Sequence, residues 1–427
     1  MEHIQDINLN NFKKDIIEET TLNLNVETLY VKKIYTDNDI KKLEGNWIDE
    51  SYIKYPILNK NTDVYWIDDN NNKHLLIKFR KNVISDKLIK IGWDNYKDLA
   101  KASRGRAAAA GPIDKNNSYW RKRNLINTSK WSTSYLNPIG NKLKEKYDKM
   151  LLDELIIISK KYKIIETDKE KIIMEIIKKE KGISKMKVNN QVASNPIGYI
   201  EEMKTISKLP CRLTHFTRTN YDKYNSGIPF IQRINFLYKK LIPDKYKKQY
   251  DRASLKSNLQ IKSINEPKII NYYNKEKEYN IKDYYYNNAT SFSTITINRN
   301  FRTALHKDGG DFKGGFGNLT VIERGKYKGG YTILPQFGIA VDVRINDFLA
   351  FDVHQWHGNS KLYIDKLDEN YNKNIPKHFK DNKKVGTVGI YEDYTRLTFV
   401  CYLREKIIKC SNIDNRFLNK SCNKKII

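Results

Sequence analysis

The part of the chain beyond residue 287 alternates short apolar runs with glycine-containing turns. The runs are rich in β-branched and aromatic residues and lie at residues 291–297, 319–322, 331–334, 339–343, 347–351 and 396–403. Closely spaced strands of this kind favour a sandwich or barrel, and a jelly roll closes such strands around a pocket. We therefore expect an α+β fold with a double-stranded β-helix (jelly-roll) core.

Helices are expected to flank this β-rich part. Apolar residues recur at helical spacing over residues 142–181, which predicts two amphipathic helices. Another helix is predicted over residues 229–250, with Pro229 near its first turn and Pro243 interrupting it. Near the N-terminus, the apolar alternation at residues 75–79 indicates a small α+β module.

These patterns divide the chain into three segments. We expect a basic α+β N-terminal region at residues 1–190, a β-rich domain at 191–405 and a basic tail at 406–427. Within the domain, residues 360–392 are rich in Lys, Asn and Asp and are predicted to form a long surface insertion.

The charge of the chain indicates a polyanionic partner. The 427 residues include 78 Lys and Arg against 50 Asp and Glu, which gives a formal net charge of +28. Nucleic acid or an anionic surface would suit this charge. The over-use of Lys, Asn, Ile and Tyr is also what a strongly A+T-biased coding sequence produces without selection for binding. Arginine is then more informative than lysine, because it has been kept against that bias.

Four arginines stand among aromatic residues in the N-terminal region. They are candidates for binding a nucleic-acid backbone and are Arg104, Arg106, Arg121 and Arg123, close to Tyr119, Trp120 and Trp131. The alternative is a basic loop whose aromatic side chains pack elsewhere.

Neither cysteine spacing nor hydropathy points to secretion or to a membrane. The four cysteines are too scattered for a disulfide framework, which favours a reducing compartment. The N-terminus lacks the basic and apolar regions of a signal peptide, and no apolar run is long enough to span a bilayer. We expect a soluble intracellular protein of the nucleus or cytoplasm. The sequence does not indicate its oligomeric state.

A His-x-Asp pair and a distant histidine suggest a metal site. His306 and Asp308 lie two positions apart, so in an extended segment both point to one face. His357 follows 51 positions after His306, at the end of a strand-like run. Two imidazoles and one carboxylate leave coordination positions open, as a non-heme Fe(II) oxygenase requires. His354 is a rival distal ligand, and the alternative to a metal site is a surface histidine beside a turn aspartate.

Downstream, Arg396 and Thr398 occupy one face of a predicted strand. A buried arginine needs an anion, and a dicarboxylate such as 2-oxoglutarate offers a carboxylate for a bidentate pair. Thr398 could donate a further hydrogen bond. The alternative is an edge-strand arginine in solvent, which the apolar residues Leu397, Phe399 and Val400 argue against.

Several ordered segments together resemble one family, the TET/JBP-type Fe(II)- and 2-oxoglutarate-dependent nucleic-acid base hydroxylases. The matching segments are residues 298–308, 328–331 with Pro335, 351–358 and 396–402. Residues 213–218 and the helix at Pro229 are similar to the element that precedes the core in fungal and protist members. The resemblance covers about residues 200 to 405. It implies an Fe(II)/2-oxoglutarate dioxygenase domain at 191–405, with His306, Asp308 and His357 as iron ligands and Arg396 and Thr398 as the 2-oxoglutarate clamp.

The resemblance also implies residues that contact the substrate. Asp311 matches a position that touches the target base, and Tyr402 matches an aromatic that stacks on the flipped base. Arg404 stands where cytosine-reading members carry a histidine, so thymine and 5-methylcytosine both stay open. The interval between His357 and Arg396 is several times the usual length, which leaves Arg404 as an alternative clamp.

The implied activity is hydroxylation of the methyl group of a DNA base with O2 as the oxidant. The DNA would be single-stranded or present a base flipped out of a duplex. An algal branch of the family implies ascorbate as an alternative cosubstrate. A protein prolyl or lysyl hydroxylase on the same iron scaffold is the alternative from another substrate class. A basic DNA-binding protein with a degenerate oxygenase fold is the alternative outside enzymes.

Overall fold

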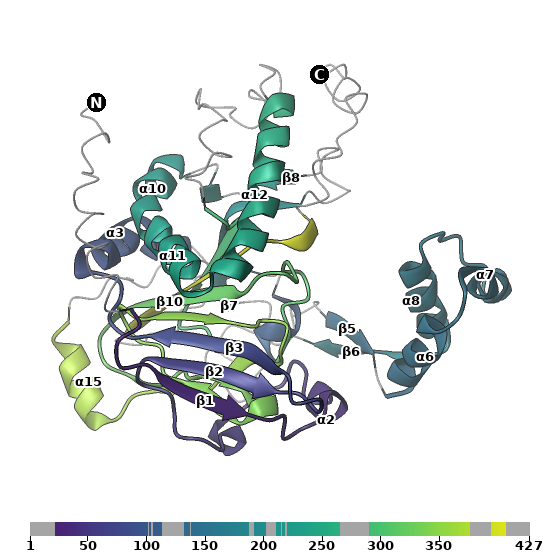
Figure 1. The fold of residues 1–427 in the computed structure, drawn as a ribbon, viewed down its shortest axis with the longest axis horizontal. Helices are drawn as coiled ribbons and strands as arrows, with labels where there is room; N and C mark the ends of the chain where they lie inside the picture. The colour runs from purple at the N-terminus through teal and green to yellow at the C-terminus, as the bar shows by residue number, and fades with distance from the viewer. Residues whose placement is uncertain are drawn as a thin grey trace, which may run out of the picture. The chain divides into compact units, whose positions relative to one another are not determined.

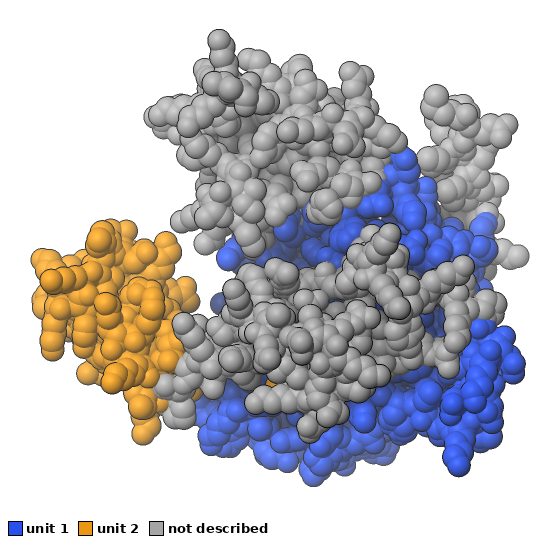
Figure 2. Space-filling view, turned by 180° about the vertical axis from the view of Figure 1, so that it is seen from behind, with its two compact units in different colours: residues 1–103, 191–427 blue, residues 104–190 orange. Residues whose placement is uncertain are grey.

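The computed structural model divides the chain into two compact units. It describes residues 22–100, 102–103, 106–112, 132–136, 138–187, 192–201, 211–214, 216–217, 220–264, 290–375 and 394–406. One unit, here called the core unit, combines Met1–Ser103 with Gln191–Ile427, and the other, the inserted unit, is Arg104–Asn190 (Figure 2).

A ten-stranded sheet forms the frame of the core unit (Figure 1). Its strands follow the order β1 (Glu27–Val31), β2 (Thr62–Ile67), β3 (Lys73–Arg80), β14 (Phe348–Phe351), β10 (Gly317–Arg324), β17 (Thr395–Tyr402), β9 (Thr294–Arg299), β7 (Val192–Glu201) and β4 (Ala102–Ser103). A short strand, β8 (Cys211–Leu213), also pairs with β7. β1 pairs with β2 in parallel, and the other neighbours are antiparallel.

Smaller sheets pack against one face of this frame. One contains β13 (Ile339–Val341), β12 (Thr332–Leu334) and β15 (Gly358–Asn359), and another pairs β11 (Lys328–Gly329) with β16 (Leu362–Tyr363). Apolar residues of both layers share one buried cluster, which includes Leu319, Val321 and Leu349 of the large sheet and Leu334, Ile339 and Val341 of the small one. The expected α+β fold with a jelly-roll core is confirmed.

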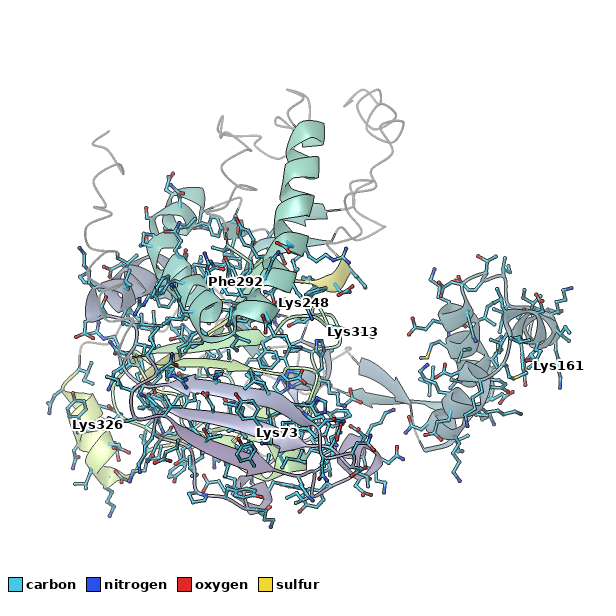
Figure 3. All side chains as sticks on the ribbon, in the orientation of Figure 1. Lys73, Lys161, Lys248, Phe292, Lys313 and Lys326 are labelled. Atoms are coloured by element: carbon cyan, nitrogen blue, oxygen red, sulfur yellow. The ribbon has the colours of Figure 1, made fainter. Side chains whose placement is uncertain are left out.

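Helices cover the other face of the large sheet (Figure 1). α3 (Asp86–Tyr96) and α11 (Ile228–Leu241) contribute to a second buried cluster that includes Ile297, Leu397 and Phe399 from the strands. α10 (Tyr221–Ser226) and α12 (Pro243–Ile264) complete this layer. Phe292 lies beneath the helices and stacks on Tyr238, with ring centroids 6.2 Å apart (Figure 3).

The two clusters define an outer and an inner face of β17. Side chains alternate along a strand, so Leu397, Phe399 and Cys401 all face the helices. Arg396, Thr398 and Tyr402 consequently face inward, toward the small sheets. The polar residues of this strand therefore line the interior of the jelly roll.

Most predicted elements are confirmed. Each of the six predicted strand runs overlaps a strand of the structure. The helix predicted at residues 229–250 is present as α11 and α12, with the break at Pro243. The prediction of two helices over residues 142–181 is wrong, because three are found: α6 (Pro138–Asp148), α7 (Leu152–Lys161) and α8 (Lys169–Lys179).

Local capping explains the additional helix. The backbone N–H of Leu151 donates to the Glu154 carboxylate (2.7 Å) and starts α7. The Asp168 carboxylate accepts from the backbone N–H of Lys171 (3.1 Å) and starts α8. The apolar faces of the three helices then meet in one cluster that contains Tyr147, Leu155, Ile173 and Ile177.

The compact units differ from the predicted segments. Strand β3 pairs with β14, with Phe79 opposite Leu349 and Ile77 opposite Phe351. Because Ile77 and Phe79 join the inner cluster, the first hundred residues belong to the core unit instead of to a region ending at residue 190.

The predicted insertion and tail are only partly described. Residues 360–375 contain β16 and helix α15 (Lys366–Lys373), while 376–393 and the tail from residue 407 lie outside the described residues. Among the helices of the described ranges, none is long and apolar enough to cross a membrane.

Arg80 provides a test of how the N-terminal strands join the core. It is fully buried and donates to Asp63 Oδ1 (2.8 Å) and to the backbone oxygen of Leu22 (2.6 Å). We expect Arg80→Ala to lower the free energy of unfolding by about 3 kcal/mol, because it removes a buried partner of the Asp63 carboxylate. Chemical denaturation measures the change. Lys60→Ala, which removes an exposed pair with Glu27, should have little effect, and equal losses in both variants would contradict this account.

Candidate metal centre

Three side chains converge inside the jelly roll. Ligand atoms of His306, Asp308 and His357 all lie within 4.8 Å of one another. His306 Nε2 is 3.4 Å from Asp308 Oδ1, and His357 Nε2 is 3.6 Å from Asp308 Oδ2. The structure thus brings together the three residues that the sequence suggested as ligands.

Backbone pairing holds the two histidines side by side. The His306 N–H donates to the His357 carbonyl (2.9 Å), and the His357 N–H donates to the His306 carbonyl (3.0 Å). The Asp308 N–H donates to the carbonyl of Val353 (3.0 Å). The ligands therefore extend from adjacent, mutually bonded segments, although 51 positions separate the histidines in sequence.

Backbone carbonyls also orient the imidazoles. His306 Nδ1 lies 2.8 Å from the Ala304 carbonyl, and His357 Nδ1 lies 2.9 Å from the Gln355 carbonyl. A carbonyl only accepts, so each Nδ1 carries a proton and each Nε2 faces Asp308, where it donates when protonated and can bind a metal cation when it is not. This is the arrangement that metal-binding histidines adopt.

The alternative distal histidine lies elsewhere. His354 directs its Nε2 toward the carbonyl of Phe312, at 3.4 Å, and it does not belong to the converging group. His357 packs its ring edge-on against Phe351, with centroids 5.1 Å apart. The two histidines therefore differ in their tertiary contacts, His354 with Phe312 and His357 with Phe351.

The cluster is arranged for an ionised carboxylate. Burial alone would raise the pKa of Asp308, but hydrogen bonds and charge from His306 and His357 bring it well below its usual range. Burial lowers the pKa of His306, but the hydrogen bond and charge of Asp308, together with the Ala304 carbonyl and the charge of Glu44, raise it overall. A bound metal cation would replace the protons that otherwise balance this carboxylate.

Arg396 is a buried cation with spare hydrogen-bonding capacity. It is 3% exposed and lies on β17, between β10 and β9. Its Nη1 donates to Thr398 Oγ1 (2.5 Å), whereas its Nη2 is buried and has no hydrogen-bond partner within the described part of the chain. A buried guanidinium with an unpaired nitrogen is the property expected of an anion-binding site.

The loop after the His-x-Asp pair runs along the end of β17. The Phe312 N–H donates to the Leu403 carbonyl (2.8 Å), and Asp311 and Arg404 face each other as a backbone bridge. Burial raises the pKa of Asp311 well above its usual range; the charge of Asp308 adds to this rise and Arg404 opposes it. The Tyr402 hydroxyl lies 3.1 Å from Thr296 Oγ1. The three predicted substrate residues, Asp311, Tyr402 and Arg404, thus lie at the end of β17 and on the loop that is bonded to it.

The predicted backbone-binding arginines are mostly outside the described residues. Arg104, Arg121 and Arg123 fall in that category. Arg106 is half-buried and precedes a 3-10 helix, η5 (Ala107–Ala110), in the inserted unit. A role for these four residues in binding nucleic acid stays a prediction.

Sequence reasoning missed the contribution of the N-terminal segment. Gly45 N–H donates to the Leu305 carbonyl (2.8 Å), and Leu305 N–H donates to the Asn46 carbonyl (3.0 Å), next to His306. Ile40 and Ile48 share a buried cluster with Leu305 and Trp356. The apolar residues Ile40 and Ile48 were the available signal, but they do not reveal their partners 250 or more positions away.

A jelly-roll core that gathers two histidines and a carboxylate, and that carries a buried arginine on an inward-facing strand, defines the class of non-heme metal oxygenases. Residues 195–405 match the family model Tet_JBP, described as the oxygenase domain of the 2OGFeDO superfamily. The predicted resemblance to the TET/JBP oxygenases is therefore confirmed over this part of the chain.

Named relatives share part of their length with this chain. Thymine dioxygenase JBP1 of Trypanosoma brucei brucei is 30% identical over 199 residues, which are 47% of this chain and 20% of the relative. Bifunctional helicase and thymine dioxygenase JBP2 of Trypanosoma cruzi is 32% identical over 168 residues, which are 39% of this chain and 13% of the relative. A solved structure of NgTET1 in complex with 5mC DNA aligns with a TM-score of 0.36 and 12% identity, over 94% of this chain and 92% of that one.

The two neighbouring histidines allow a matched test of the metal centre. We expect His357→Ala to weaken binding of Co(II), used as a stable substitute for Fe(II), by about 100-fold or more, because an imidazole ligand is lost. Isothermal titration calorimetry on the full chain measures the affinity. His354→Ala should bind Co(II) like the unaltered protein, and a large loss in that variant would contradict the assignment of His357.

Proposed function

We propose that this protein is an Fe(II)- and 2-oxoglutarate-dependent dioxygenase that hydroxylates the methyl group of a DNA base. The convergence of His306, Asp308 and His357 inside the oxygenase core carries the proposal. Relatives named thymine dioxygenases support thymine as the first substrate to test, with 5-methylcytosine as the second.

The donor atoms fit the proposed cofactors. Two imidazole nitrogens and one carboxylate are the ligand set of non-heme Fe(II) oxygenases, and Arg396 with Thr398 offers donors for a carboxylate of 2-oxoglutarate. When bound, Fe(II) and 2-oxoglutarate supply, with O2, the oxidising chemistry that converts a methyl C–H bond into C–OH. The chain itself must bind, orient and shield the reactants.

The inward strand face of β17 would orient the base. His357 is only 6% exposed, so a methyl group stacked in a duplex could not reach the centre, and the base must be flipped out or supplied single-stranded. Tyr402 offers an aromatic ring, held through its hydroxyl by Thr296. Asp311 and Arg404 would present an acceptor and donors to the polar edge of the base.

The charge of the chain supports DNA as the partner. A net charge of +28 attracts a polyphosphate, and Arg104, Arg106, Arg121 and Arg123 are proposed backbone contacts. Binding through such contacts should weaken as salt concentration rises.

The activity is tested with the full chain, Fe(II), 2-oxoglutarate and DNA oligonucleotides that carry thymine or 5-methylcytosine. We expect a hydroxymethyl base, measured by nucleoside mass spectrometry, together with succinate. Asp308→Asn should yield neither product, because it disrupts the ligand set. An ascorbate arm without 2-oxoglutarate tests the alternative cosubstrate. Unmodified DNA, with hydroxylation of prolyl or lysyl peptides instead, would contradict the proposal.

The cosubstrate clamp gives a separate prediction. We expect Arg396→Met to raise the KM for 2-oxoglutarate by about 10- to 100-fold, because a charge-assisted hydrogen-bond donor is lost, and to change the KM for DNA little. Steady-state kinetics measure both constants. Arg324→Met is the matched control, since Arg324 lies on the adjacent strand over the Trp93 ring. A KM for 2-oxoglutarate unchanged in Arg396→Met would show that another residue is the clamp.

A further inference from the structure

One carboxylate outside the family-matched segment contacts both loops that carry the candidate ligands. Asp37 begins helix α2 (Asp37–Lys41). Its Oδ1 accepts from Lys307 Nζ (2.9 Å) and from Trp356 Nε1 (3.2 Å). Lys307 stands between His306 and Asp308 in sequence, and Trp356 directly precedes His357. Asp37 therefore connects the neighbours of all three candidate ligands.

The contacts of Asp37 form a local network. Lys307 Nζ also lies 4.9 Å from the centroid of the Trp356 ring, so the cation, the indole and the carboxylate meet at one point. Trp356 is 5% exposed, and a buried indole N–H requires an acceptor. Although the Asp37 side chain is 55% exposed, its Oδ1 atom is the acceptor for the indole N–H of Trp356.

Helix α2 is itself anchored to the core. Ile40 of this helix packs in the buried cluster with Leu305 and Trp356. The following residues, Gly45 and Asn46, bond to the backbone of Leu305, directly before His306. The position of Asp37 is therefore fixed by the packing of Ile40 and by the backbone hydrogen bonds of Gly45 and Asn46.

We propose that Asp37 is a positioning residue for the metal centre, acting through Lys307 and Trp356. The inference rests on the proposed metal site. Metal ligands must be held within about half an ångström of their working positions, and the groups that hold them influence affinity strongly. Asp37 would keep the His-x-Asp loop and the His357 loop at the spacing that brings the three ligand atoms together.

Matched variants on one helix test this role in the full chain. We expect Asp37→Ala to weaken Co(II) binding by about tenfold, because one link in the support of the ligands is lost. Asp39→Ala is the control, since Asp39 lies on the same helix but bonds to Thr36 and Lys42, the residues that flank the helix, and not to the ligand loops. Calorimetry measures affinity, and the Co(II) d–d absorption spectrum reports ligand geometry. The thermal midpoints of both metal-free variants should be similar.

A double-mutant cycle shows whether Asp37 acts through its partners. Trp356→Phe removes the indole donor, and its effect on Co(II) affinity should be smaller in the Asp37→Ala background than in the unaltered protein. Independent, additive losses would overturn the inference, as would an Asp37→Ala variant with the affinity and spectrum of Asp39→Ala. If the unaltered protein binds neither Co(II) nor Fe(II), the proposed function itself is wrong. If the unaltered protein binds the metal and Asp37→Ala binds it equally well, only the role of Asp37 is wrong.

Discussion

Two backbone hydrogen bonds between His306 and His357 bring the candidate metal ligands together. The rest of the core unit holds the two segments that carry these histidines in place. His357 directly precedes β15, which pairs with β12, while the segment ending at His306 is held by Gly45 and Asn46. The reciprocal pair fixes the separation of the two imidazoles, and carbonyls of Ala304 and Gln355 fix their orientation. These main-chain bonds hold the two histidine segments together, and the side-chain contacts of Asp37 with Lys307 and Trp356 form a second link between the same loops.

The second requirement is an interior that tolerates charge. Arg396 and Asp311 are buried and the Asp308 side chain is 30% exposed, and removing such groups from water is costly unless each finds a partner. Asp308 is balanced by two histidines, whereas Arg396 retains a nitrogen with no hydrogen-bond partner among the residues that the structure describes. Alternation along β17 makes this possible, because Leu397 and Phe399 secure the strand against the helices while Arg396 and Thr398 stand on its other face. The same strand thus supplies stability on one side and chemistry on the other.

The N-terminal strands belong to the same large sheet as the family-matched strands. β3 extends the large sheet beyond β14, and Arg80 links it to Asp63 and Leu22. Helix α2 and the residues after it contact the ligand loops directly. The family-matched segment, residues 195–405, therefore completes both its sheet and its candidate metal centre with residues from the first hundred positions. In the sequence, the inserted unit lies between the first hundred residues and the family-matched segment.

The sequence by itself determined the strands, the helix break at Pro243, the His-x-Asp pair and the shared strand face of Arg396 and Thr398, because alternation and proline geometry are local properties. Only the tertiary structure decided between His354 and His357, since both lie in one short segment and differ in the surfaces they meet. It also decided that β3 joins β14, a pairing across more than 260 positions that no local pattern encodes. The role of Asp37 belongs to the same category, because its partners Lys307 and Trp356 are 270 and 319 positions away.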